Sequence, residues 1–286
     1  ENRSSPFFLF LHGYDSHGQY DLPASQRQGI TGFDTDLNGS IEEQAELRER
    51  GLQTIDNPGD AIDLTGVLDE QDAGYLEKVY DLKVQNADQR LGNFIDFLRT
   101  EGLYDNSIIV LFSDHGDEFM EHQGLDHGST LYQEQLHVVM MVHFPGYNDR
   151  MDVEAPVRTM DIFPTIFDAL ELAGPKDVDG SSLLPILRDP QAMATYAPQI
   201  LSETDYRLFA RHRMIREGDY KLILDLLDGK KELYDLADDP GETRNIASSE
   251  AKLSYEMEQR LRKWMGQVQT NPDAYRGLRE EHITVF

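Results

Sequence analysis

Four side chains of this sequence have the types and positions to carry out chemistry together: His17, Asp114, His115 and His127. Asp114 and His115 directly follow the apolar run of residues 108–112. A carboxylate offers an oxygen ligand and an imidazole a nitrogen ligand, so this adjacent pair could hold one divalent cation. Taken alone, such a pair is more often a capping aspartate beside a surface histidine, because short motifs give false positives.

The two other histidines favour the interpretation as a site. His17 follows a second apolar run at residues 6–11, and His127 precedes a short helical turn. Ligands bind at the carboxyl ends of strands in open α/β sheets, so histidines that follow strands can converge on one point. A helix N-terminus beside His127 would favour an anion. Together these residues predict a metal ion next to an anionic ester.

The elements that must position these residues are apolar strands and amphipathic helices. The continuous apolar runs are typical of strands in a sheet that is covered on both faces. Strands are expected at residues 6–11, 107–112 and 137–144. Helices are expected at residues 40–51, 73–101 and 162–174, the last of them capped by Asp161. This order predicts an α/β fold with a mixed, mostly parallel sheet between layers of helices.

The pattern changes in the C-terminal third of the chain. Alternating residues with turn signals at 217–219 and 228–229 predict an antiparallel meander. A final amphipathic helix is expected at residues 249–268. We therefore expect an α/β domain at residues 1–194 and a small subdomain of antiparallel sheet plus helix at residues 195–286.

Composition limits the classes of partner. The 53 acidic and 26 basic residues give a net charge of −27, which argues against nucleic-acid binding because that binding depends on neutralising phosphates. No apolar run approaches the ~18 residues that a membrane helix needs. The absence of cysteine excludes disulfides, thiolate metal sites and a cysteine nucleophile in this sequence.

Five segments, in the correct order, resemble a sulfatase of the alkaline phosphatase superfamily. The central one contains the sequence SDHGDEF after an apolar strand, and the others are similar to the family's histidine segment, long helix, Asp-x-x-Pro-Thr helix and C-terminal signature. These segments are residues 6–20, 75–107, 104–146, 157–174 and 218–247. The resemblance covers nearly the whole chain and implies an alkaline phosphatase-like fold.

The resemblance also implies a role for each of the four side chains. Asp114 and His115 match two metal ligands, and the metal in sulfatases is usually calcium. Arylsulfatases often have asparagine in place of His115, and an imidazole also suits zinc or manganese. His17 matches the histidine that binds sulfate oxygens, and His127 matches a lysine or histidine that contacts the bridging oxygen of the ester. One of these two would act as the general acid that protonates the leaving oxygen.

The sequence departs from the family at the nucleophile. Sulfatases carry a formylglycine made within a Cys/Ser-x-Pro/Ala-x-Arg motif. Residues 4–8 begin like this motif, but Phe8 stands where arginine is required. We therefore expect this chain to correspond to a sulfatase without its N-terminal nucleophile segment, which leaves it inactive when alone.

Three functions remain open at this point. The leading prediction is a metal-dependent sulfatase-type hydrolase that acts on sulfate monoesters of a small molecule or glycan. The second is a phosphatase or phosphonate monoester hydrolase of the same superfamily. The third is a non-catalytic fragment or pseudoenzyme. A periplasmic or extracellular bacterial location is favoured over a cytoplasmic one, and the oligomeric state is open.

An arginine-rich stretch at residues 207–216 stands out in this acidic sequence. A solvated strand is the more common explanation for exposed charge. The alternative hypothesis is that Arg211 and Arg213 contact a polyanionic substrate such as a sulfated glycan.

Overall fold

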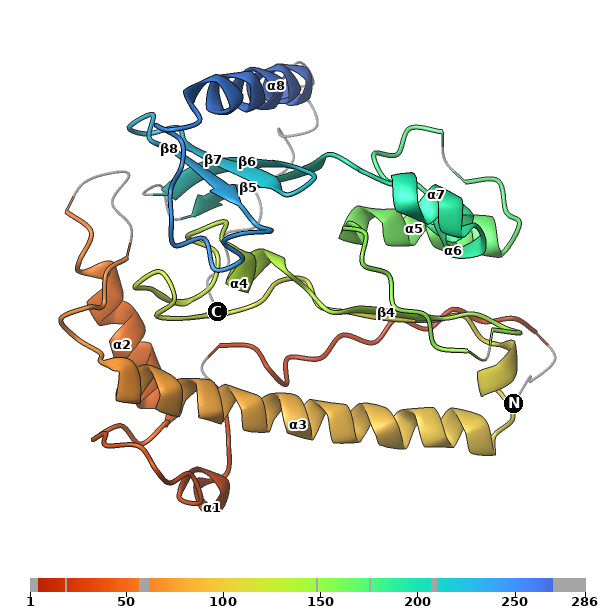
Figure 1. Ribbon diagram of the computed structural model, residues 1–286. Helices are drawn as coiled ribbons and strands as arrows, with labels where there is room; N and C mark the ends of the chain where they lie inside the picture. The colour runs from red at the N-terminus through yellow and green to blue at the C-terminus, as the bar shows by residue number, and fades with distance from the viewer. Residues whose placement is uncertain are drawn as a thin grey trace.

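The computed structural model describes residues 5–18, 20–56, 62–147, 149–174, 176–206 and 210–269 of the 286-residue chain. A long helix, α3, runs along one side of the molecule, and a four-stranded sheet covered by helix α8 forms the opposite side (Figure 1). The loops with the candidate site residues and the short helix α4 lie between these two layers.

Helix α3 (Glu70–Thr100) confirms the long amphipathic helix predicted from residue 73. Its start lies three residues earlier, because Asp69 accepts hydrogen bonds from the backbone N–H groups of Gln71 and Asp72. None of the helices in the described part of the chain is long and apolar enough to cross a membrane.

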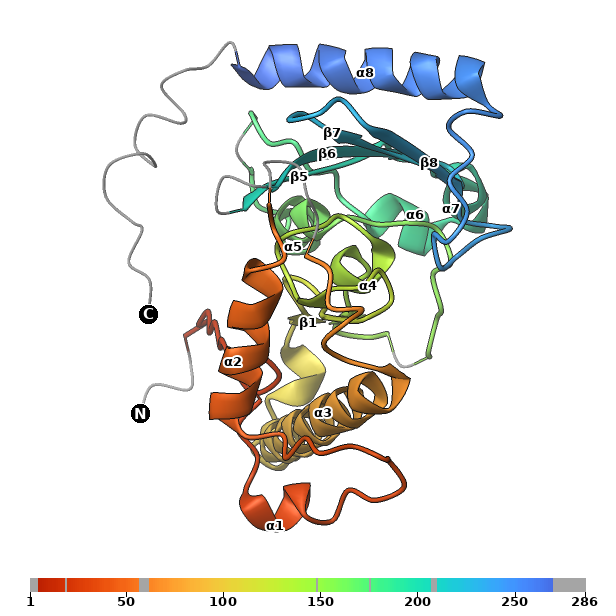
Figure 2. The same ribbon diagram turned by 90° about the vertical axis from the view of Figure 1, so that its left-hand side faces the viewer.

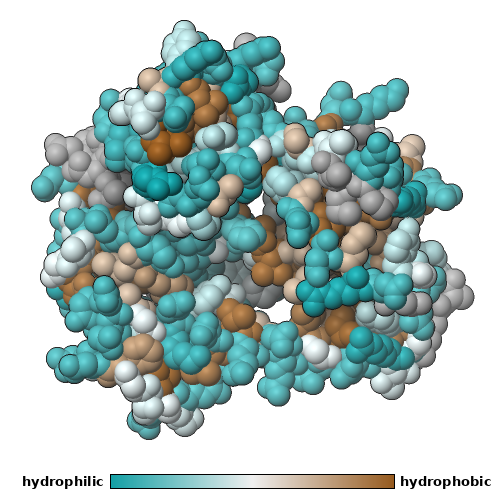
Figure 3. Space-filling view, in the orientation of Figure 1, coloured by the Kyte–Doolittle hydropathy of each residue, from teal (hydrophilic) through white to brown (hydrophobic). Residues whose placement is uncertain are grey.

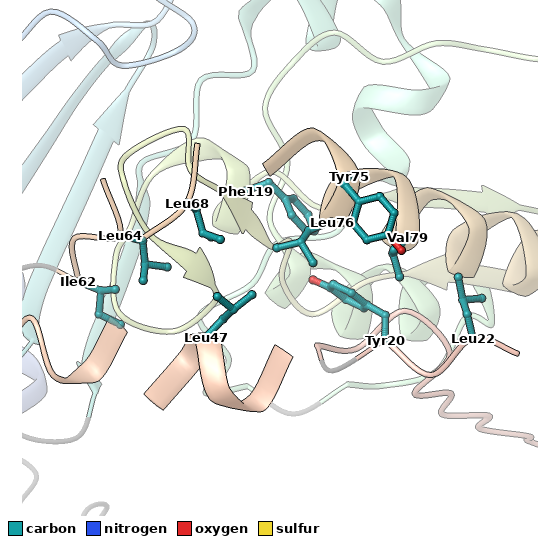
Figure 4. Close-up of a cluster of buried hydrophobic side chains, with 10 residues drawn as sticks. All are labelled: Tyr20, Leu22, Leu47, Ile62, Leu64, Leu68, Tyr75, Leu76, Val79 and Phe119. Atoms are coloured by element: carbon teal, nitrogen blue, oxygen red, sulfur yellow. The ribbon is translucent and has the colours of Figure 1, made fainter. Parts of the chain in front are cut away.

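The N-terminal half of α3 packs into the larger hydrophobic core (Figure 4). This core joins α3 to helix α2 (Ile41–Leu52) and to Phe119 of strand β2 (Glu118–Phe119). Its buried members are Tyr20, Leu22, Leu47, Ile62, Leu64, Leu68, Tyr75, Leu76, Val79 and Phe119. Burial of these side chains stabilises the packing of α2 and α3 against the segments that carry the candidate site residues.

Helix α2 begins as predicted, with the Ser40 side chain accepting a hydrogen bond from the N–H of Glu43. Its buried Gln44 holds the segment that follows His17, because its Oε1 accepts from the backbone N–H of Tyr20 at 2.6 Å. Helix α2 therefore positions one part of the candidate site.

Two small two-stranded sheets lie next to Asp114, His115 and His127 in the sequence. Strand β1 (Ile109–Phe112) pairs antiparallel with β4 (Met140–His143), and β2 (Glu118–Phe119) pairs antiparallel with β3 (Leu125–Asp126). The strands at 107–112 and 137–144 are confirmed in shortened form. Every strand pairing in the described residues is antiparallel, so the parallel pairings expected for the main sheet are not found among them.

The prediction of a buried strand at residues 6–11 is wrong. This segment makes no strand pairing, and its apolar side chains are exposed, with Phe8 at 83%. An apolar run indicates what a strand could bury, but a strand also needs a neighbouring backbone to pair with. Figure 3 shows that one face of the molecule is mostly hydrophilic and is broken by separate hydrophobic patches.

The C-terminal meander is confirmed. Four strands pair antiparallel in the order β5-β6-β7-β8, and helix α8 (Ala251–Gln269) packs on them through Met257 and Leu261. The strands are β5 (Ile200–Tyr206), β6 (Ala210–Glu217), β7 (Tyr220–Asp225) and β8 (Lys231–Asp235). The predicted boundary between residues 1–194 and 195–286 stays a prediction.

Short helices connect the larger elements. They are α1 (Ala24–Arg27), η1 (Tyr104–Asn106), α4 (Gln133–Leu136), η2 (Thr159–Asp161), α5 (Ile162–Ala169), α6 (Leu184–Arg188) and α7 (Pro190–Thr195). Asp161 stands at the N-cap of α5 as predicted, but its buried carboxylate makes no capping hydrogen bond. It accepts instead from Arg158 Nη2 at 2.7 Å and from the N–H of Ser181 at 2.8 Å.

Candidate active site

The structure brings three of the four candidate residues together. The ring centroids of His17 and His127 lie 5.0 Å apart, those of His17 and His115 lie 6.0 Å apart, and His115 stacks on His127 at 3.8 Å. One ring nitrogen of each histidine lies within 4.8 Å of the other two. Residues almost 100 positions apart in the sequence thus form one cluster.

Asp114 lies at the edge of this cluster. Its Oδ1 is 3.8 Å from Nε2 of His115 and accepts a hydrogen bond from the backbone N–H of His115 at 3.2 Å. The Asp114 side chain is 73% exposed, so solvent reaches it freely. The carboxylate and the neighbouring imidazole are close enough to share one cation.

Two carboxylates that sequence reasoning missed hold His127 in place. Nδ1 of His127 lies 2.6 Å from Oδ1 of Asp117 and 2.8 Å from Oδ1 of Asp126. Burial of the imidazole acts to lower the pKa of His127, but the two carboxylates outweigh burial and raise that pKa to about 9. His127 is therefore a cation at neutral pH, and its Nδ1 lies against the two carboxylates.

Each carboxylate has a second partner. Asp117 accepts a hydrogen bond from the Tyr20 hydroxyl at 3.0 Å, and Asp126 lies 3.1 Å from Nη1 of Arg48. The segment with His17 packs closely here, since a Cβ at Gly18 would lie 2.7 Å from Oδ1 of Asp126. The glycine after His17 thus permits the close approach of the two chain segments.

The β2-β3 hairpin that carries these aspartates is held by a buried glutamate. Glu118 accepts hydrogen bonds from the N–H groups of Gly124 and His122 and from the side-chain amide of Gln135. Burial raises the pKa of Glu118, and the Gly124 N–H opposes this effect. The hydrogen bonds fix the hairpin, and with it the position of His127.

A second histidine network ties this hairpin to α4. Nδ1 of His122 lies 2.6 Å from Oε1 of Glu134, and its ring stacks on Tyr132 with centroids 3.6 Å apart. Burial acts to lower the pKa of His122, but the hydrogen bond and charge of Glu134 raise it overall. This pair is separate from the cluster of His17, His115 and His127.

Replacing His122 with glutamine is expected to destabilise the protein more at about pH 5.5 than at about pH 8.5. The pKa of an unfolded histidine is about 6.5, and that of His122 is raised on folding. The stability from the pair with Glu134 is therefore fully present below about pH 6.5 and is lost as the pH rises through the folded-state pKa. Urea unfolding of both proteins at the two pH values measures this, and an equal loss at both would contradict it.

The arginine-rich stretch is largely neutralised by its own neighbours. Arg213 is only 8% exposed and lies 2.9 Å from Asp205 and 3.0 Å from Glu203. Arg211 is exposed and 3.5 Å from Asp205. Burial and pairing of Arg213 argue against its contact with a polyanionic substrate, and the hypothesis for the exposed Arg211 stays a prediction. Residues 207–209 lie outside the described residues.

Comparison with solved structures defines the class of fold. A 2-O GAG sulfatase aligns with a TM-score of 0.62 at 24% identity, covering 72% of this chain and 46% of that chain. A phosphonate monoester hydrolase from Silicibacter pomeroyi aligns with a TM-score of 0.61 at 24% identity, covering 82% and 50%. The predicted α/β, alkaline phosphatase-like fold is confirmed.

Sequence comparison defines the family within that class. The Sulfatase family profile matches residues 1–172, and the profile for N-sulphoglucosamine sulphohydrolase, C-terminal, matches residues 121–270. The chain belongs to the sulfatase family. Arylsulfatase K from Rattus norvegicus is 29% identical over 300 residues, which cover 99% of this chain and 53% of the relative. The chain thus spans about half the length of the curated relatives it matches.

Proposed function

We propose that this chain supplies the leaving-group side of the active site of a sulfatase-type hydrolase, which cleaves sulfate monoesters. The observation that supports this most is the convergence of His17, His115 and His127, with His127 fixed by two carboxylates. A sulfated small molecule or glycan is the proposed substrate. The chain's membership of the sulfatase family and its fold support this reaction class.

His127 is the proposed donor to the bridging oxygen of the ester. Its Nδ1 faces Asp117 and Asp126, so Nε2 is the ring nitrogen left to a substrate. The carboxylates keep a proton on Nδ1, fix the ring and stabilise the imidazolium, which carries its second proton on Nε2. In this arrangement Nε2–H gives its proton to the oxygen that leaves when the sulfur–oxygen bond breaks.

His17 is the proposed contact to the sulfate oxygens. Its ring lies edge-on to both His115 and His127, at centroid distances of 6.0 and 5.0 Å. A sulfate group near the protonated His127 is within reach of the His17 ring, which then orients the ester for the proton transfer.

Asp114 and His115 are the proposed ligands of a divalent cation. An aspartate oxygen 3.8 Å from an imidazole nitrogen fits two donors to one ion. Calcium is the proposed ion, and zinc or manganese is the alternative because the imidazole provides a nitrogen ligand. When bound, the ion polarises the sulfuryl oxygens and stabilises the charge that grows on them.

Replacing Asp114 with alanine is expected to weaken calcium binding to this chain at least tenfold. A charged oxygen ligand is lost, and the exposed position lets the fold remain intact. Isothermal titration of the metal-free chain with calcium, zinc and manganese measures this. Asp105→Ala, at an exposed position on η1, is the matched control. Equal weakening in both variants would contradict the assignment of Asp114.

The reaction class is tested by turnover of the native gene product. Sulfate release from 4-nitrophenyl sulfate is expected to exceed the hydrolysis of the matching phenylphosphonate ester by at least tenfold. The opposite preference would favour the phosphonate monoester hydrolase, for which His115 in the metal site is the supporting feature. No turnover of either ester would favour the non-catalytic alternative.

A further inference from the structure

A cavity is lined by residues of α1, of the segment that follows it and of α3. Helix α1 lies on the side of α3 away from α4 (Figures 1 and 2). The cavity has a volume of about 320 Å³, within the range of small-molecule sites. It is separate from the histidine cluster, and no residue of that cluster contributes to its wall. Its walls include Arg27, Gln28, Ile30, Phe33, Leu37 and Tyr75.

The charge of this cavity differs from that of the chain. The chain has 53 acidic residues, yet among the described residues that line the cavity none is acidic and Arg27 is the single charged one. The nearby carboxylates of Glu43 and Asp72 do not line the cavity, and neutral groups donate hydrogen bonds to them. Glu43 accepts backbone N–H groups of Asn38 and Gly39, and Asp72 accepts the hydroxyl of Thr35.

Two polar side chains of the cavity lining have hydrogen-bonding capacity to spare. Nη1 of Arg27 donates to the carbonyl of Leu22, and no carboxylate among the described residues pairs with this guanidinium. A guanidinium has five N–H donors, so several remain for a ligand. The hydroxyl of Tyr75 has no hydrogen-bond partner in the described part of the chain. Burial raises the pKa of Tyr75, which keeps the phenol protonated and able to donate.

The other walls are apolar and partly aromatic. The rings of Phe33 and Tyr75 meet at 77° with centroids 6.1 Å apart, and Ile30 and Leu37 complete this surface. An aromatic wall beside a few hydrogen-bond donors matches the two faces of a sugar ring, whose C–H face is apolar and whose rim is hydroxylated.

We propose that this cavity binds an anionic sugar ring, with Arg27 holding the carboxylate or sulfate and the Phe33 and Tyr75 rings facing the sugar. The cation without a carboxylate partner selects a negative ligand, and the aromatic wall selects a ring over a bare ion. The inference does not depend on the proposed reaction, because no residue of the histidine cluster takes part.

Ligand-observed NMR titration of the chain tests this with methyl glucuronide, glucose 6-sulfate and methyl glucoside. We expect at least one anionic sugar to bind at least tenfold more tightly than the neutral glucoside. The stronger of the two identifies carboxylate or sulfate as the recognised group. Equal binding of all three, or binding of none, would overturn the proposal.

Two pairs of variants locate the binding. Arg27→Gln and Gln28→Glu are each expected to weaken binding of the preferred anionic sugar about tenfold, by removing the cation or adding a like charge at the exposed cavity rim. Arg50→Gln and Gln85→Glu make the same charge changes at exposed positions outside the cavity. Gln85 lies about 15 Å along α3 from Tyr75. Equal weakening in test and control variants would overturn the assignment to this cavity.

Discussion

His127→Gln is expected to lower kcat of the native gene product for phenyl sulfate by about 10²- to 10⁴-fold, the usual contribution of a general acid. Glutamine keeps a polar side chain of similar length that can donate a hydrogen bond. It cannot release a proton to the leaving oxygen. The imidazole in contrast is held by carboxylates at 2.6 and 2.8 Å from its Nδ1, which leaves Nε2 for this transfer.

Comparison of two leaving groups makes this prediction specific. Phenolate is a stronger base than 4-nitrophenolate, so it gains more from a proton as the sulfur–oxygen bond breaks. The loss in kcat for 4-nitrophenyl sulfate should therefore be at least tenfold smaller than for phenyl sulfate. An equal loss for both esters would show that His127 acts in binding or folding rather than in proton transfer.

The matched control is His137→Gln, which makes the same change at an exposed position after α4. It is expected to leave kcat for both esters unchanged within about twofold, because exposed substitutions away from special features have small effects. If His137→Gln lowers kcat as much as His127→Gln does, the loss would come from a general disturbance of the region around α4 rather than from a missing proton donor.

The elements with strong local signals could be predicted from the sequence. The apolar spacing of α3, the Ser40 and Glu43 pair at the start of α2 and the turns of the C-terminal meander are all local patterns, and the structure has each of these elements. The apolar run at 6–11 was misleading, since its periodicity says nothing about whether another strand pairs with it.

The candidate site could be predicted only in part. The three histidines stand out because each belongs to a loop that follows an apolar run, and the structure brings them together. Asp117 and Asp126 were missed because they lie in a loop crowded with acidic residues, where no spacing marks two of them. Asp126 directly precedes His127 in the sequence, whereas Asp117 reaches it only through the pairing of β2 with β3, which places Glu118 opposite Asp126.

A buried ion pair connects the C-terminal sheet to the site region. Nζ of Lys221 on β7 lies 2.7 Å from Oε1 of Glu242, and both side chains are fully buried. Oε2 of Glu242 accepts from the N–H of Gln133, the first residue of α4, at 2.6 Å. Burial lowers the pKa of Lys221 and raises that of Glu242, so each charge depends on the other.

Lys221→Met is expected to destabilise the protein by about 3–5 kcal/mol, because removing one partner of a buried pair leaves the other charge uncompensated. Urea unfolding followed by the fluorescence of Trp264 measures this. Trp264 is the single tryptophan of the sequence, and it packs against the core between α8 and the sheet. Lys252→Met, at an exposed helix position, is the matched control with an expected change within about 0.5 kcal/mol.

The double variant Lys221→Met, Glu242→Gln separates the unpaired charge from other causes of instability. The amide of glutamine can still accept from the N–H of Gln133 but carries no charge, so part of the lost stability should return. If the double variant is less stable than Lys221→Met, the charge of Glu242 is not the cause. Recovery would instead show that the uncharged methionine and glutamine side chains together still hold α4 in place. Helix α4 begins six residues after His127, the proposed proton donor.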